Sequence, residues 1–213
     1  KKETPKPVDE HKGHTSILGK SEVAPEKLAA FVKANNPTAQ DIDEIAKAFI
    51  EVGNTYGIRG DIAFCQSILE TGWFTYKGSA VTPDQHNYCG LGVVSNGVKG
   101  HSFDTVKDGV TAQIQHLYAY ATTKPLPSGE KLIDPRFKYV TRGVAPHWED
   151  LSMRWAMNEN YGTHILAIYD NLKKFEYIPE DKSVPVEEKK EKEELNVKLI
   201  NEVNRLLYEI LKD

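Results

Sequence analysis

One carboxylate near the end of an apolar helical stretch is the first candidate for chemistry in this chain. Glu70 follows Ile68 and Leu69 and precedes a Gly72-Trp73 break. Apolar surroundings disfavour the charged form of a carboxyl group and raise its pKa, so such an acid can keep its proton near neutral pH and protonate a leaving group. A solvated glutamate at a helix end is the alternative that this residue alone leaves open.

Aromatic side chains recur around this acid and beyond it. Carboxylic acids beside exposed aromatic faces are what a carbohydrate cleft requires, because sugar rings stack their C–H faces on aromatics while a protonated acid serves the glycosidic oxygen. Core packing is the alternative for each of these rings. The candidate rings are Trp73, Phe74, Tyr76, Tyr88, Phe103, Tyr118, Tyr120, Tyr139, Trp148, Trp155 and Tyr161.

Other catalytic chemistries lack their characteristic residues. The chain has no Gly-rich phosphate loop and no Gly-x-Ser-x-Gly elbow. Cys65 lies in an apolar helical pattern, which disfavours an activated thiolate, and with Cys89 it either forms one disulfide or remains a buried thiol. The seven histidines are scattered without metal-ligand spacing, so we expect no metal and no cofactor.

Length and charge limit the class of protein. The 213 residues fit one domain of ordinary size plus tails. The formal net charge of −4 does not suggest a nucleic-acid partner. No apolar run approaches the roughly 20 residues that span a bilayer, so we expect no membrane span.

Hydrophobic periodicity predicts a mainly helical (α+β) domain over residues 23–176. The turn at Asn96-Gly97 lies between short apolar pieces and predicts a small β-hairpin after the helix that carries Glu70. Helical spacing is expected over residues 25–35, 38–56, 62–69, 106–121 and 165–172.

The two ends of the chain differ from this domain in composition. Residues 1–22 are polar, contain Pro and Gly, and predict a linker or extended arm, while residues 177–194 predict a charged linker. Residues 195–213 predict a separate amphipathic helix. We favour self-association of this helix into a homo-oligomer; docking on its own domain and binding to another protein are the alternatives. Its apolar stripe consists of Ile200, Val203, Leu207 and Ile210.

Four segments, in the same order, resemble the bacterial glucosaminidases of glycoside hydrolase family 73. Ala63–Trp73 is similar to the catalytic-helix motif of that family, typically Ala-x-Ala-x-x-Glu-Ser/Thr-Gly-Trp. Asn87–Gly92 resembles the Asn-Phe/Leu-Phe-Gly-Ile-Lys segment, and Phe103–Val110 resembles the segment that opens the next helix. Arg154–Ala156 and Asn160–Gly162 resemble the segment near the C-terminal helix.

The resemblance covers about residues 22 to 176 and implies a lysozyme-like fold. It implies an endo-β-N-acetylglucosaminidase that cleaves the β-1,4 bond after N-acetylglucosamine in peptidoglycan glycan strands, with Glu70 as the general acid. Tyr161 would lie in the cleft near the acetamido sugar. The implied location is secreted or at the cell wall, and an autolysin and a phage-encoded lysin would look alike. The residues implied to shape the sugar subsites are Trp73, Tyr88, Phe103 and Trp155.

The chain departs from the family pattern in its second carboxylate. Residues 88–103 contain no Asp or Glu, although many family members are thought to place a Glu in or near the hairpin. Asp104, just after this segment, is the candidate, and assistance by the acetamide of the substrate is the alternative. A lytic transglycosylase needs only one catalytic Glu and is the nearest rival. A glycan-binding module without turnover is the rival from another class.

Overall fold

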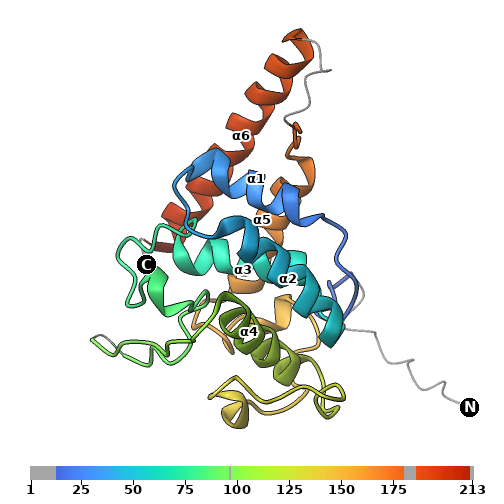
Figure 1. Cartoon of the computed structure of the whole chain (residues 1–213), viewed down its shortest axis with the longest axis vertical. Coiled ribbons are helices and arrows are strands. Elements are labelled where there is room, and N and C mark those ends of the chain that lie inside the picture. The colour runs from blue at the N-terminus through green and yellow to red at the C-terminus, as the bar shows by residue number, and fades with distance from the viewer. Residues whose placement is uncertain (1–12, 96, 180–185, 212–213) are drawn as a thin grey trace, which may run out of the picture.

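A computed structural model describes residues 13–95, 97–179 and 186–211, and over these residues the chain is mainly helical, as predicted. Regular strands are absent from this described part. Its β-type pairing is limited to isolated bridges such as the one between Leu18 and Ile58. Figure 1 shows the arrangement of the helices. They are α1 (Pro25–Asn35), α2 (Ile42–Tyr56), α3 (Gly60–Thr71), η1 (Pro83–Gln85), α4 (Val106–Ala121), η2 (Phe137–Tyr139), η3 (Glu149–Leu151), α5 (Tyr161–Lys174) and α6 (Val186–Leu211).

Helix α3, which carries Glu70, is the centre of the core. It contacts α1, α2 and α5, and α4 packs against α2 and reaches α3 through the side chain of Gln113. The close crossing of α2 and α3 depends on glycine: a Cβ at Gly60 would lie 2.1 Å from the carbonyl oxygen of Phe49. Ile62 and Ile68 are fully buried, so the all-round apolar character of this helix reflects contacts on most of its faces.

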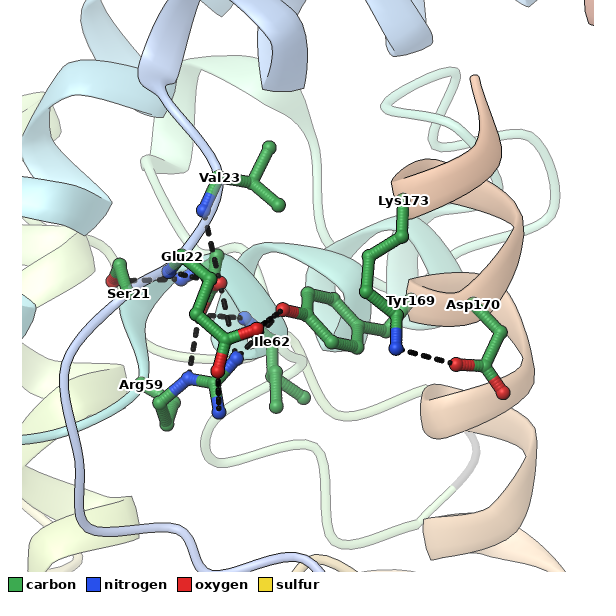
Figure 2. Close-up of polar contacts among 9 residues, drawn as sticks. Ser21, Glu22, Val23, Arg59, Ile62, Tyr169, Asp170 and Lys173 are labelled. Carbon is green, nitrogen blue, oxygen red and sulfur yellow. Dashed lines mark hydrogen bonds and ion pairs between the residues drawn. The ribbon is translucent and has the colours of Figure 1, made fainter.

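A buried acid, Asp61, fixes the start of α3, and Figure 2 labels its partners Glu22, Val23 and Arg59. Asp61 has no exposed surface, and its carboxylate accepts hydrogen bonds from the backbone N–H groups of Glu22 (2.8 Å) and Val23 (3.3 Å). Nε of Arg59 also donates to Asp61, at 3.2 Å. Nη2 of Arg59 donates to the hydroxyl of Tyr169 on α5, at 2.6 Å. These bonds connect the segment before α1, the start of α3 and the middle of α5.

The second half of the predicted N-terminal arm is part of the folded body. Ile17 is fully buried; its N–H donates to the carbonyl of Pro146 (2.9 Å), and its carbonyl accepts from the N–H of Arg59 (3.0 Å). Residues 1–12, the first part of that arm, lie outside the described residues.

The β-hairpin predicted around Asn96-Gly97 is not observed. Asn96 lies outside the described residues, and its described neighbours form a loop in which the N–H of His101 donates to the carbonyl of Leu91 at 2.8 Å. Cross-strand side-chain pairs stabilise hairpins, and the glycines here provide none. Val94 is 65% exposed, so it has no apolar surface to pack on. The glycines of this segment are Gly90, Gly92, Gly97 and Gly100.

The apolar stripe of α6 packs on the chain's own domain. Val203 is fully buried and Leu207 nearly so, and α6 contacts α1 and α5. Figure 1 shows its first turns projecting beyond the body. The predicted self-association through this stripe is therefore unsupported, because docking already buries its apolar side chains.

Helix α6 also begins earlier than the sequence predicts, within the segment expected to be a charged linker; residues 180–185 of that linker lie outside the described residues. A 2.8 Å ion pair between Lys192 and Glu188, one helical turn apart, supports these exposed turns. Across the described ranges, no helix combines the length and apolarity needed to cross a membrane.

Candidate active site

Glu70 lies in the last turn of α3 and lines a cleft of about 410 Å³. The turn ends at Gly72, which adopts a left-handed conformation (φ 55°) and stops the helix directly after the acid. Glu70 is partly buried, so its carboxyl group contacts both the protein interior and the cleft. The cleft is also lined by Ser79, Ala80 and residues 89–94, and by His116, Tyr120, Arg136 and residues 154–156.

The hydroxyl of Tyr161, the first residue of α5, donates a hydrogen bond to Oε1 of Glu70. Burial raises the pKa of Tyr161 well above its usual value, so this hydroxyl keeps its proton and acts as a donor. The position of Tyr161 depends on the next residue, because a Cβ at Gly162 would lie 2.1 Å from the carbonyl oxygen of Trp148. Glycine therefore allows α5 to begin close enough to reach Glu70.

A chain of buried amides orients the tyrosine. Nε2 of Gln66 donates to the Tyr161 hydroxyl at 2.8 Å, and Oε1 of Gln66 accepts from Nε2 of Gln113 on α4 at 2.9 Å. Oε1 of Gln113 accepts from the hydroxyl of Ser67 at 3.0 Å. Since Gln66 and Gln113 are fully buried, each amide needs these partners, and their orientations are mutually fixed.

The environment of Glu70 suits a proton donor. Desolvation by burial raises the pKa of its carboxyl group to about 7, while hydrogen bonds from Tyr161 and Trp155 oppose that rise. A group with this pKa holds its proton in a large fraction of molecules at neutral pH, and its conjugate base can take a proton back. Tyr161 donates to Oε1, and Trp155 donates to the same carboxyl group, so two side chains orient the acid.

Trp155 forms an aromatic wall of the cleft. Its ring meets that of His116 edge to face, with centroids 4.9 Å apart, and the ring of Tyr120 lies 6.0 Å away. Nδ1 of His116 is hydrogen-bonded at 2.7 Å to the buried carboxylate of Asp134. This bond fixes the imidazole plane, and the imidazole in turn limits the orientation of Trp155, whose partly exposed ring can stack on a sugar.

Of the residues expected from the sequence, Glu70 and Trp155 line the cleft. Tyr161 was expected in the cleft, but it is buried behind Glu70 and reaches it by a hydrogen bond, and Trp73 and Tyr88 are not in the cleft either. Trp73 is buried; its indole N–H donates to Asn204 of α6 at 2.8 Å. Tyr88 is also buried, and its ring packs against aromatic side chains of the core.

Phe103 and Asp104 likewise lie outside the residues that line the cleft. Phe103 is half-buried and packs beside Cys89 and Leu91, where it supports the loop that forms one cleft wall. Asp104 is exposed just before α4. Its role as second carboxylate stays a prediction, and the structure does not bring it to Glu70.

Neither cysteine is a catalytic candidate. Cys65 and Cys89 are buried free thiols, so of the two sequence alternatives the structure has the unpaired one. Cys89 lines the cleft, but burial raises the pKa of both thiols well above the usual value, which disfavours a nucleophilic thiolate.

One group of candidate metal ligands occurs among the described residues, and it is not in the cleft. His14, His147 and Asp150 bring ligand atoms within 4.8 Å of one another. Nδ1 of His147 is hydrogen-bonded to Asp150 at 2.9 Å, an interaction that explains their approach. The cleft itself offers one carboxylate, one imidazole and one buried thiol that come from separate elements.

Sequence reasoning missed His116, Asp134, Arg136 and Arg154 as site residues. His116 lies within the apolar helix α4, where the pattern predicts core packing. Asp134 and Arg136 come from the irregular segment between α4 and η2, whose path no periodicity encodes. The available signal was the Arg154-Trp155-Ala156 segment, since its Trp155 was already a candidate.

A helical body with one proton-bearing glutamate at the edge of an aromatic-walled cleft defines a glycosidase-type site. The chain belongs to the Glucosaminidase family, described as mannosyl-glycoprotein endo-beta-N-acetylglucosaminidase, which it matches over residues 46–174. It is therefore a glycoside hydrolase of the endo-β-N-acetylglucosaminidase type.

The chain is also similar to an uncharacterised protein of Borreliella burgdorferi. The two are 34% identical over 154 residues, which cover 71% of this chain and 74% of that protein. No solved structure matches the chain, so the lysozyme-like description of its fold stays a prediction.

Proposed function

We propose that this protein hydrolyses the β-1,4 bond after N-acetylglucosamine in peptidoglycan, with Glu70 as the general acid. Membership of the Glucosaminidase family supports a peptidoglycan glycosidase in general. The observation that carries the assignment of Glu70 is its hydrogen bond from Tyr161 at a cleft where its pKa is about 7.

In this mechanism Glu70 transfers its proton to the bridging oxygen as the bond from that oxygen to the anomeric carbon breaks. The electron pair of the broken bond stays on the leaving sugar, and positive charge develops on the ring that remains. The Tyr161 hydroxyl stabilises the carboxylate that Glu70 becomes. Glu70 then removes a proton from the water that attacks the anomeric carbon, which restores the acid.

The stabilisation of the positive ring needs a second group. Glycosidases with two protein carboxylates hold them about 5–5.5 Å or about 6.5–9.5 Å apart. Glu70 is the sole carboxylate among the described residues that line the cleft. We therefore infer that the acetamide of the substrate attacks the anomeric carbon and forms a cyclic intermediate, which water opens.

The same single carboxylate favours a second candidate, a lytic transglycosylase. In that reaction the bond after the muramic residue breaks, and the 6-hydroxyl of that residue, rather than water, attacks its own anomeric carbon and gives an anhydro end. Mass analysis of the soluble products separates the candidates: the proposed hydrolase leaves a reducing N-acetylglucosamine end, the rival leaves an anhydro-muramic end, and a glycan-binding module releases nothing.

The Glu70→Gln variant tests the acid. Gln is nearly isosteric and keeps an oxygen for the Tyr161 hydroxyl, but it cannot supply a proton, so product release should stop. Glu44→Gln, at an exposed position on α2, is the matched control and should cleave normally. Continued cleavage by Glu70→Gln would show that another group is the acid. An enzyme with this substrate acts outside the membrane, so we propose that it is secreted or located at the cell wall.

A further inference from the structure

We propose that Arg136 and Arg154 form a carboxylate-binding subsite beside the catalytic acid, which selects glycan strands that carry carboxylate groups over uncharged N-acetylglucosamine oligomers. This inference rests on the proposed function, because it names the substrate class that the same cleft prefers.

The first support is the charge of the cleft. Arg136 and Arg154 are the Lys or Arg side chains among the described residues that line it, and Glu70 is the one acid. Neither arginine takes part in an ion pair within the described residues. With Glu70 protonated, the cleft therefore has two positive charges without an acidic partner, although an uncharged glycan would need none.

The second support is that both arginines and Tyr120 line the same cleft. Burial raises the pKa of the Tyr120 phenol, and the positive charges of Arg136 and Arg154 both oppose that rise, in agreement with this placement. The hydroxyl donates to the carbonyl of Arg154 at 3.1 Å. Tyr120 also stacks beside Trp155, which places the positive region next to the aromatic wall.

The third support is the shape of the surface next to the cleft. A second hollow of about 330 Å³ shares Tyr120 and Arg154 with the cleft and is bordered by Tyr139. The guanidinium of Arg136 lies 5.0 Å from the centroid of the Tyr139 ring. A group attached to the glycan in the cleft can therefore extend past Arg154 into a second basic and aromatic hollow.

Both arginines are partly held in place. The backbone N–H of Arg136 donates to Oδ1 of Asp134 at 2.8 Å, and the other oxygen of Asp134 binds His116. Nη1 of Arg154 donates to the carbonyl of Asp150 at 2.9 Å. A guanidinium group has five N–H donors, so each arginine keeps donors for the two oxygens of a carboxylate.

A peptidoglycan strand offers carboxylates from two sources. Its peptide stems carry free carboxylates, and a muramic residue without its peptide exposes the carboxylate of its lactyl group. Chitooligosaccharides have the same β-1,4-linked N-acetylglucosamine units but neither carboxylate. Three substrates therefore separate the possibilities: peptide-bearing strands, peptide-free strands and chitooligosaccharides.

The test compares kcat/KM on these three substrates for the wild type, Arg136→Gln and Arg154→Gln. Loss of one charge-assisted pair should lower the ratio of charged to uncharged kcat/KM by about tenfold. A fall with peptide-bearing strands alone identifies the stem carboxylates, and a fall with peptide-free strands identifies the lactyl group. Arg136→Lys and Arg154→Lys should each keep part of the wild-type ratio. Lysine retains the positive charge but lacks the planar guanidinium group that binds both oxygens of a carboxylate.

Lys107→Gln is the matched control. It removes one positive charge at an exposed position of α4 that lines neither the cleft nor the second hollow, so the ratio should stay at the wild-type value. An unchanged ratio in both arginine variants, or an equal loss on all three substrates, would overturn the subsite.

Binding to the Glu70→Gln variant separates this inference from the proposed function. Calorimetry with a peptide-bearing and a peptide-free disaccharide, with and without Arg154→Gln, measures the subsite even where nothing is cleaved. Tighter binding of a carboxylate-bearing ligand that depends on Arg154 and weakens with salt supports the subsite. Binding that is independent of Arg154 refutes it, whatever the activity of the wild type.

Discussion

The hydroxyl of Tyr161 and Oε1 of Glu70 share a hydrogen bond although 91 residues separate them in the chain. One belongs to the first turn of α5 and the other to the last turn of α3. The proposed acid is therefore a product of helix packing, because α3 supplies the carboxyl group and α5 supplies the hydroxyl that binds its Oε1.

The Tyr161→Phe variant removes the donor and leaves the ring. Since this hydrogen bond opposes the rise in the pKa of Glu70, its loss should raise that pKa further. The falling alkaline limb of kcat/KM against pH should then move to higher pH. The rate at its optimum should fall by about one to two orders of magnitude, because the carboxyl group is less well oriented.

A merely structural role for Tyr161 would lower the rate without moving that limb. Tyr208→Phe is the control, because this tyrosine is 67% exposed on α6. Its pH profile should match that of the wild type.

We expect the ionised carboxylate of Glu70 to lower the free energy of unfolding at alkaline pH. Its pKa is about 7 in the folded chain against a usual value of 4.5, so the folded state binds more protons between these two pH values. The free energy of unfolding therefore falls as pH rises through this range, and the loss is complete above about pH 7. At pH 8, Glu70→Gln should be more stable than the wild type by about 3 kcal/mol, and at pH 4 the difference should disappear.

Urea unfolding at the two pH values, followed by tryptophan fluorescence, measures this difference. A variant with the same stability as the wild type at pH 8 would mean that the carboxylate is well solvated in the folded chain. Such a result would also remove the reason for its raised pKa.

Asp61 should be a major determinant of stability without touching the cleft. Asp61→Ala leaves the Arg59 side chain, which is 12% exposed, without its buried carboxylate partner. Removing one member of a buried pair costs about 3–5 kcal/mol. Asp43→Ala is the control, since its ion pair with Lys33 is exposed and should contribute less than about 1 kcal/mol. Equal effects in urea unfolding would contradict the buried network of Figure 2.

Because α6 docks on the body of its own chain, we expect its apolar side chains to stabilise the fold and the protein to be a monomer. Leu207 is 7% exposed, and Leu207→Ala should lower the free energy of unfolding by about 2–3 kcal/mol. Tyr208→Ala, at the exposed neighbouring position, should change it by less than about 0.5 kcal/mol. Light scattering should give a monomer for the wild type. A dimer that Leu207→Ala dissociates would restore the interpretation that this stripe joins two copies.

Local sequence was sufficient for most of the helices and for the position of Glu70 at the end of one of them. The apolar spacing of α3 and the Gly72 stop indicate a helix that ends directly after Glu70, and both features depend on near neighbours. Tyr161 was found through the resemblance of its segment to a family. The absence of the hairpin also has a local cause, because a run with four glycines provides few side chains that can pair across strands.

The assignment of aromatic residues to the cleft was less accurate because burial depends on distant packing. Trp73 follows α3 closely in sequence. Its indole nevertheless binds Asn204 of α6, which lies more than a hundred residues further along the chain. Trp155 lies in the cleft because His116 and Tyr120 of α4 support its ring. Nothing near either tryptophan in the sequence distinguishes the buried ring from the accessible one.

The bond between Trp73 and Asn204 has a consequence for biosynthesis. The indole of Trp73 packs on Phe31 at a centroid distance of 5.1 Å, but its N–H is satisfied only by a residue of α6. A ribosome completes α1 and α3 long before it reaches residue 204. The segment after α3 therefore reaches its final packing only after α6 has been synthesised, and a nascent chain that stops short of residue 204 leaves the indole N–H of Trp73 without this partner.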